Sequence, residues 1–206
     1  MPEMNKNILV WIDTETTGLN TSKCKLLEVG VIVTDKDLNE LESQTHVIHY
    51  PASCFPDWLA AGSMEQIAYE MHKENGLLDE VSNWDTSTTV DLAETQIISM
   101  IDRHANPITE PLPAGGGSNF GGYDKAVLRR FMPRLVNRLH HRSMDTTTLK
   151  VAADLWGLQP SLVNAKVVRS HRALDDIRQD IALAGSMMDI LTRAQTLTGV
   201  ANDSNP

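Results

Sequence analysis

The apolar positions near the start of the chain predict a β-sheet. Residues 8–12 form a continuous apolar run that is closed by the polar, glycine-containing stretch 13–20. A short run of this kind is typical of a central strand that is buried on both faces. The segments 26–33 and 45–50 have the apolar and β-branched content of strands that would pair with it. Asp13 therefore lies where a core strand emerges from the sheet.

Most of the remaining chain has helical periodicity. Apolar side chains recur every three or four residues in several segments, which indicates helices. These segments are 63–75, 90–104, a stretch after Asp124, and 146–156. The last helix is the clearest, because its apolar residues predict one continuous stripe that packs on a core. The stripe consists of Leu174, Ile177, Ile181, Ala184, Met188 and Leu191.

The order of these elements favours a single α/β domain. Residues 107–117 contain three prolines and three consecutive glycines, so we expect a loop there rather than a linker between domains. We expect residues 1–7 to be an N-terminal tail and residues 8–195 to be the domain. Residues 196–206 are polar and should form a disordered C-terminal tail.

Composition narrows the class of protein. A chain of 206 residues with 41% apolar residues can bury one core. It has no apolar stretch of the length that a membrane span needs, and Cys24 and Cys54 lack the spacing of a disulfide framework or a zinc site. We therefore expect a cytoplasmic protein without a membrane partner. The net charge of −9 opposes binding of long polyanions, so a nucleic-acid substrate should be short.

Two acids follow the first strand. If the strand continues, the side chains of Asp13 and Glu15 point to the same face, about 7 Å apart along the chain. Carboxylate oxygens suit Mg²⁺ or Mn²⁺, and two such ions about 4 Å apart stabilise the attacking and leaving oxygens at a phosphodiester. Such acid pairs are also common in solvated turns. Burial of two like charges at a strand end is costly, however, unless a cation or a donor neutralises them.

A histidine and two further acids mark the start of the last helix. Neutral histidine accepts a proton from water at pH 7 more readily than an unperturbed carboxylate, so His171 is a candidate general base. The alternative is a surface histidine at a helix start. Helical phase does not separate Asp175 from Asp176, because both flank the apolar stripe.

Three motifs together resemble those of the DEDDh exonuclease family. They are DTETTGL at 13–19, NFGGYDKAVLRRFMP at 119–133 and HRALDDIRQD at 171–180. Within that family the chain is most similar to the oligoribonuclease group, on the basis of YEMHKENGLLDEV at 69–81 and MDTTTLK at 144–150. Three motifs in order are far more specific than any one of them. The resemblance implies an RNase H-like fold, in which helices flank a mixed β-sheet.

The resemblance also implies roles for individual residues. It makes His171 the general base and selects Asp176, rather than Asp175, as the acid of the third motif. Leu19 resembles an apolar wedge between two bases, and His72 and Arg142 match positions that contact a terminal phosphate. The catalytic metal ligands for two Mg²⁺ or Mn²⁺ ions would be Asp13, Glu15, Asp124 and Asp176. The substrate-binding candidates are Thr16, Leu19, His72, Asn119, Arg142 and Thr147.

The chain departs from the family pattern at two positions. Phe120 stands where a small, phosphate-facing serine is typical, and His141 stands where the family has a tyrosine that reaches the other subunit's site. These changes affect the residues expected around the 5′ phosphate. The resemblance still implies a homodimer.

The expected activity is metal-dependent 3′-to-5′ hydrolysis of short RNA to nucleoside 5′-monophosphates. One alternative is a DEDDh exonuclease that acts on single-stranded DNA, as in proofreading, because it would have the same acids. The acidic charge and the MDTTTLK segment argue against it. A second alternative is an inactive protein that binds nucleic-acid ends, which predicts the loss of an acid or of the histidine. The sequence retains all of them.

Overall fold

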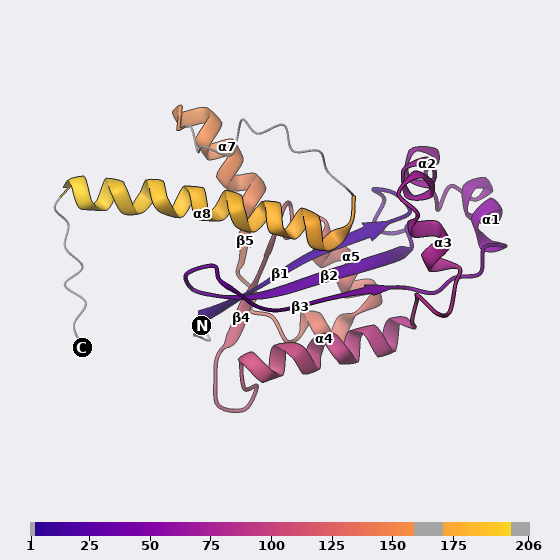
Figure 1. Ribbon diagram of the computed structural model, residues 1–206, viewed down its shortest axis with the longest axis horizontal. Helices are drawn as coiled ribbons and strands as arrows, with labels where there is room; N and C mark the ends of the chain where they lie inside the picture. Colours follow the sequence, from indigo (N-terminus) through magenta and orange to yellow (C-terminus); the bar gives the residue numbers. More distant parts are fainter. Residues whose placement is uncertain (1–2, 159–170, 199–206) are drawn as a thin grey trace.

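The computed structural model describes residues 3–158 and 171–198. A five-stranded sheet forms its centre, in the order β3-β2-β1-β4-β5 (Figure 1). β1 pairs antiparallel with β2, and β2 pairs antiparallel with β3, whereas β4 runs parallel to both β1 and β5. The predicted single α/β domain with a mixed sheet is confirmed. The strands are β1 (Met4–Thr16), β2 (Leu26–Asp35), β3 (Glu40–Val47), β4 (Leu112–Gly117) and β5 (Ser143–Asp145).

Helices cover both faces of the sheet. Helix α8 crosses one face over β1 and β2 with α7 beside it, and α4 lies on the opposite face (Figure 1). The short helices α1, α2 and α3 gather at the end of the sheet where β1 finishes. The helices are α1 (Cys54–Ala60), α2 (Gln66–Glu74), α3 (Leu77–Val81), α4 (Val90–His104), α5 (Asp124–Phe131), α6 (Pro133–Val136), α7 (Thr146–Trp156) and α8 (Ala173–Thr198).

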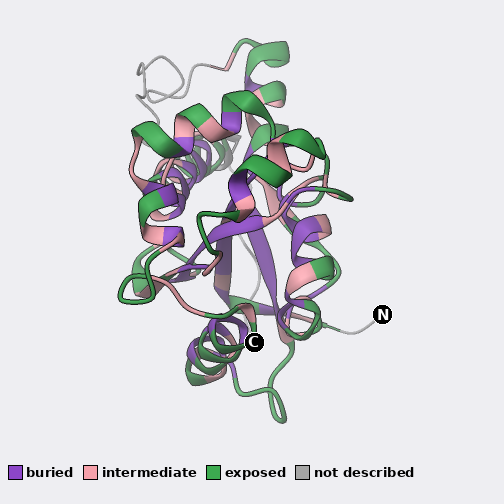
Figure 2. Ribbon diagram, turned by 90° about the vertical axis from the view of Figure 1, so that its right-hand side faces the viewer, coloured by how far each residue is buried: buried purple, intermediate pink, exposed green. Residues whose placement is uncertain are grey.

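The side chains of β1 alternate between two apolar clusters. Val10 and Ile12 pack in the cluster that includes residues of α4, α5 and α6, whereas Trp11 packs with Ile177 and Ala184 of α8. Figure 2 shows the result, with buried strands between helices whose outer faces are exposed. Because strand side chains alternate with a period of two, Trp11 and the residues two and four positions later share the face that α8 covers.

The predicted loop at 107–117 is wrong for its second half, because residues 112–117 form β4, the strand between β1 and β5. The glycines of β4 allow neighbouring side chains to pack closely against the strand. A Cβ at Gly115 would lie 2.5 Å from the Phe120 ring, and one at Gly116 would lie 3.3 Å from the Trp11 ring. The glycines thus make room for two large buried aromatic side chains. Because such a strand has few apolar side chains of its own, its sequence has the pattern of a turn.

The boundaries of the domain in the structure also differ from the predicted ones. β1 begins at Met4, since Met4 and Asn5 pair with β4, so residues 4–7 belong to the sheet rather than to a tail. α8 continues to Thr198, and the rest of the predicted C-terminal tail lies outside the described residues. Only the first part of the apolar stripe packs on the core, because Met188 and Leu191 are 39% and 62% exposed. Within residues 3–158 and 171–198, no helix has the length and apolar content for a bilayer span.

Candidate active site

The first motif lies at the end of β1. The alternation along the strand places Asp13 and Glu15 on the same face as Trp11, beneath α8. Glu15 is buried and Asp13 is partly buried. The predicted strand therefore carries both acids into the interface between the sheet and α8.

A close contact between helix and sheet brings the third motif to these acids. A Cβ at Gly30 of β2 would lie 2.7 Å from the Cβ of Ala173, the first residue of α8. Glycine at this position lets the start of the helix approach the strand that pairs with Asp13. Asp176 follows one turn later and is buried.

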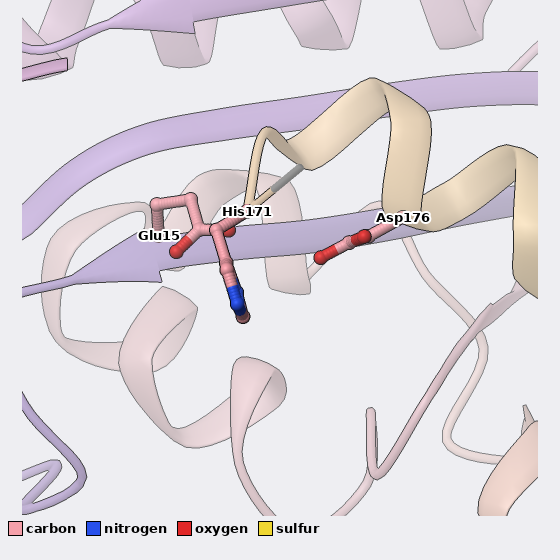
Figure 3. Close-up of side chains that lie close together, drawn as sticks. All are labelled: Glu15, His171 and Asp176. Carbon is pink, nitrogen blue, oxygen red and sulfur yellow. The ribbon is translucent and has the colours of Figure 1, made fainter. Parts of the chain in front are cut away.

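Glu15, His171 and Asp176 form one cluster (Figure 3). One carboxylate oxygen of each acid and one ring nitrogen of His171 all lie within 4.8 Å of one another. His171 precedes α8 and has a left-handed backbone, with φ of 51°. Asp175 instead exposes 56% of its side chain and faces Arg178 at 4.0 Å. The geometry thus favours Asp176 over Asp175, a choice that helical phase left open.

The second motif is joined to the first by hydrogen bonds. Asp124 is the first residue of α5 and is only 2% exposed. Its Oδ1 accepts a bond from the Thr14 backbone N–H at 3.0 Å and another from Thr14 Oγ1 at 2.6 Å. Since Thr14 stands between Asp13 and Glu15, these bonds hold Asp124 against the end of β1. The three motifs therefore converge at one place, from β1, α5 and α8.

The carboxylates repel one another when charged. Burial and the charges of Asp124, Glu15 and Asp176 raise the pKa of Asp13 well above its ordinary value. Burial and the nearby Asp176 and Glu28 carboxylates raise the pKa of Glu15 to about 7. Burial raises the pKa of Asp124 to about 7, although its hydrogen bonds from Thr14 oppose the shift. A divalent cation would relieve this repulsion, and oxygen ligands are those that Mg²⁺ and Mn²⁺ prefer.

A fifth acid at this centre was missed by the sequence reasoning. Asp180 is 5% exposed and lies one helical turn after Asp176 on α8. Its charge contributes to the raised pKa values of Asp13 and Asp124. Thr146 Oγ1, at the start of α7, donates a hydrogen bond to Asp180 Oδ1 at 2.9 Å. The spacing of four residues from Asp176 was the signal that could have identified it.

Leu19 is presented on a rigid turn. Its side chain is 77% exposed, while the backbone around it is fixed by neighbouring elements. The Leu19 N–H donates to Glu65 Oε1 at 2.8 Å, and the Tyr123 hydroxyl donates to the Gly18 carbonyl at 2.8 Å. Thr16, another substrate-binding candidate, is buried, with its hydroxyl 2.5 Å from the Tyr123 hydroxyl. An exposed apolar side chain on a fixed turn suits contact with a nucleobase.

His72 lies under the first motif rather than at its surface. Its side chain is fully buried, and Nε2 donates to the Thr16 carbonyl at 2.9 Å. The same nitrogen lies 3.8 Å from Glu15 Oε2, while Nδ1 is buried without a hydrogen-bond partner. Burial lowers the pKa of His72, which favours the neutral ring. In this structure His72 therefore supports the backbone of the motif, and its contact with a terminal phosphate stays a prediction.

Polar candidates gather where β4 and β5 end and α7 begins. Ser118 Oγ lies 3.1 Å from Thr147 Oγ1, and the Asn119 N–H donates to Asp145 Oδ1 at 3.2 Å. Asn119 is exposed and has a φ of 54°. Thr147 is also exposed, as is Arg142, which precedes β5.

Phe120 and His141, the two departures from the family pattern, lie in different surroundings. Phe120 is fully buried in the core against Gly115, so it does not face a substrate phosphate. The preceding residues Ser118 and Asn119 supply the polar groups of this turn instead. The exposed His141 ring packs beside His140, with the ring centroids 4.1 Å apart.

Comparisons with known proteins agree with this arrangement. A family model described as exonuclease matches residues 10–91. An oligoribonuclease of Francisella tularensis subsp. tularensis is 34% identical over 174 residues, which cover 84% of this chain and 90% of the relative. An oligoribonuclease of Tropheryma whipplei is 35% identical over 176 residues, covering 84% of this chain and 88% of the relative.

A solved structure shares the fold. The zinc-bound Escherichia coli exonuclease I in complex with single-stranded DNA superimposes with a TM-score of 0.65 at 18% identity. The superposition covers 92% of this chain and 42% of that longer chain. It confirms the predicted exonuclease fold, and the sequence matches over most of both chains give the family. The chain therefore belongs to the oligoribonuclease family of 3′-to-5′ exonucleases.

Proposed function

We propose that this protein degrades short RNA from a free 3′ end and releases nucleoside 5′-monophosphates. The observation that carries the proposal is the cluster of Glu15, Asp176 and His171 within 4.8 Å, at the strand end that also bears Asp13. Acids alone could form a structural cation site. A histidine among them adds a group that can accept a proton from water at neutral pH.

The acids and the histidine of the site would have different roles in the reaction. Asp13, Glu15, Asp124 and Asp176 would hold two Mg²⁺ or Mn²⁺ ions, which when bound supply charge stabilisation at the scissile phosphate. A ring nitrogen of His171 accepts the proton of the attacking water. The bonds from Thr14 keep Asp124 in place throughout.

The surroundings of the site favour a short RNA strand. Leu19 would contact the terminal bases through its exposed side chain. Asn119, Arg142 and Thr147 would bind a phosphate of the substrate through their exposed polar side chains. The net charge of −9 disfavours extended contact with a long strand. Thr16 would act through its backbone and its bonds within the turn.

We also propose that the protein is a homodimer in the cytoplasm. α7 and α8 lie together and carry exposed apolar side chains, including Leu155, Trp156 and Leu191 at 76%, 73% and 62% exposure. A cavity of about 470 Å³ adjoins this surface between the start of β1 and α8. Surfaces of this kind are typical of protein–protein contact. Both cysteines are free thiols, as is usual in a reducing compartment.

Cleavage of end-labelled oligonucleotides tests the activity. RNA of two, five and twenty nucleotides, with matched DNA, would be incubated with Mg²⁺, Mn²⁺ or EDTA. We expect the two-nucleotide RNA to disappear fastest and no cleavage in EDTA. Asp13→Ala should abolish turnover and leave the protein folded, because it removes a metal ligand together with a source of repulsion.

Other outcomes point to the alternatives. A preference for longer DNA would favour the proofreading-like exonuclease, and binding without cleavage of any substrate would favour the inactive protein. Unchanged turnover of Asp13→Ala at saturating Mg²⁺ would contradict the metal-site assignment.

Light scattering tests the proposed dimer. It should give twice the mass of one chain for the wild type and for Ile108→Asp, a control variant at an exposed loop position. Leu191→Asp should be monomeric, whereas a monomeric wild type would exclude the dimer.

A further inference from the structure

The segment that carries His171 is tied to the rest of the molecule by an ion-pair network around the buried Glu28. Glu28 of β2 is only 1% exposed and faces Arg172, the residue after His171. Arg172 Nη2 donates to Glu28 Oε1 at 3.0 Å, and Arg172 Nε donates to the same carboxylate at 3.2 Å. Glu28 Oε2 also accepts a bond from the Ala173 N–H at 3.1 Å. The Glu28 carboxylate therefore binds both the Arg172 side chain, just before α8, and the backbone of the first turn of that helix.

The other side of Arg172 is held by α3. Its Nη1 and Nη2 donate to the two oxygens of Glu80 at 2.8 Å and 2.9 Å. Bidentate pairs of this geometry fix the orientation of a guanidinium group as well as its position. Arg172 thus links β2, α3 and the start of α8.

The backbone of His171 has its own support from α2. Asn75, the C-cap residue of that helix, donates from Nδ2 to the His171 carbonyl at 2.9 Å. Its Oδ1 accepts the Leu77 N–H at 3.1 Å, so the amide is held at both ends. His171 has a φ of 51°, a left-handed backbone conformation that is uncommon for residues other than glycine.

We propose that Asn75 and Arg172 are positioning residues that hold the His171 ring at the water it deprotonates. This inference rests on the proposed function, in which His171 is the general base. Neither residue belongs to the cluster of Glu15, His171 and Asp176. Each acts through the backbone next to His171, and a displacement of about 1 Å at a reacting group can reduce turnover by roughly 100-fold.

Asn75→Ala and Arg172→Lys test the two supports separately. We expect kcat to fall by between about 10-fold and about 100-fold in each, with KM and Mn²⁺ affinity near the wild-type values. Lysine keeps the charge of Arg172 but cannot form both bidentate pairs. Thermal unfolding would establish that each variant is folded. If Asn75→Ala does not fold, Arg172→Lys alone serves as the test.

Two matched controls remove similar interactions elsewhere. Asn83→Ala deletes an asparagine whose Oδ1 accepts the Asp85 N–H at 3.0 Å, in a turn without a bond to His171. Arg178→Lys alters an arginine on α8 that pairs with Glu40 at 3.4 Å. Both controls should retain the kcat of the wild type.

A double-mutant cycle separates positioning from general stability. If Asn75 acts through His171, Asn75→Ala should cost nothing further in kcat once His171 is alanine. An equal loss in both backgrounds, or a full kcat in Asn75→Ala and Arg172→Lys, would overturn the inference. A wild type that cleaves no substrate would instead refute the proposed function, so the two failures are distinguishable.

Discussion

Glu15→Gln isolates the energetic effect of one buried carboxylate at the site. Burial and the neighbouring Asp176 and Glu28 carboxylates raise the pKa of Glu15 from 4.5 to about 7. At about 1.4 kcal/mol per pKa unit, this shift corresponds to roughly 3 kcal/mol. That is the cost of ionising Glu15 in the folded, metal-free protein relative to the unfolded chain. Glutamine is similar in shape and carries no charge.

The cost has a defined dependence on pH. Because the folded pKa lies above the unfolded pKa, the folded state binds more protons between the two values, and stability falls as the pH rises through this range. Below about pH 4.5 Glu15 is protonated in both states, so its ionisation costs nothing. At pH 8 in EDTA, Glu15→Gln should exceed the wild type by up to about 3 kcal/mol in free energy of unfolding. For a chain of this size that is about 6–12 °C in Tm.

Urea unfolding at pH 4.5, 6 and 8, in EDTA and in Mn²⁺, measures this effect. The stability advantage of the variant should appear only at the higher pH values in EDTA. Mn²⁺ should reverse the order at pH 8, because binding to the folded state stabilises it by mass action and the variant lacks one ligand. Glu74→Gln makes the same chemical change at an exposed position of α2 and should show neither effect. A variant that is less stable than the wild type at pH 8 in EDTA would refute the reasoning.

The remaining predictions concern single side chains at the site. His171→Ala should lower kcat by about 10²–10⁴-fold with Mn²⁺ affinity intact by calorimetry, and a change in KM alone would contradict its role as a base. Asp180→Asn, which can still accept the bond from Thr146, should raise metal-free stability at pH 8 and weaken Mn²⁺ binding several-fold; unchanged Mn²⁺ affinity would separate Asp180 from the metal centre. Leu19→Ala should change the free energy of unfolding by less than about 0.5 kcal/mol but raise KM for the two-nucleotide RNA, and an unchanged KM would remove its proposed contact.

Local patterns predicted most of the elements correctly. The apolar run at 8–12 became the centre of β1, and the helical periodicity of 90–104 and 146–156 matches α4 and α7. These patterns are informative because each element buries one face or both, and burial depends on the spacing of apolar side chains. Gly157, with a φ of 64°, ends α7. The candidate acids and the candidate histidine also came from the sequence, through motifs that resemble a known family.

Packing between distant segments decided what local patterns could not. The segment of β4 was predicted to be a loop because it is rich in glycine. In the structure these glycines pack against Trp11 and Phe120, and a local sequence pattern does not reveal such contacts. Phe120 stands where the family pattern has a phosphate-facing serine, and only its packing against Gly115 shows that it lies in the core.

The site itself is a product of the tertiary structure. Asp176 faces the cluster, whereas Asp175 is exposed beside Arg178, and Gly30 lets the start of α8 approach β2 closely. Asp180 joins the acids because Thr146 of a neighbouring helix holds it there. Sequence determined which chemical groups were present and on which elements. Only the tertiary structure decided which of them meet, because their distances depend on contacts between segments more than a hundred residues apart.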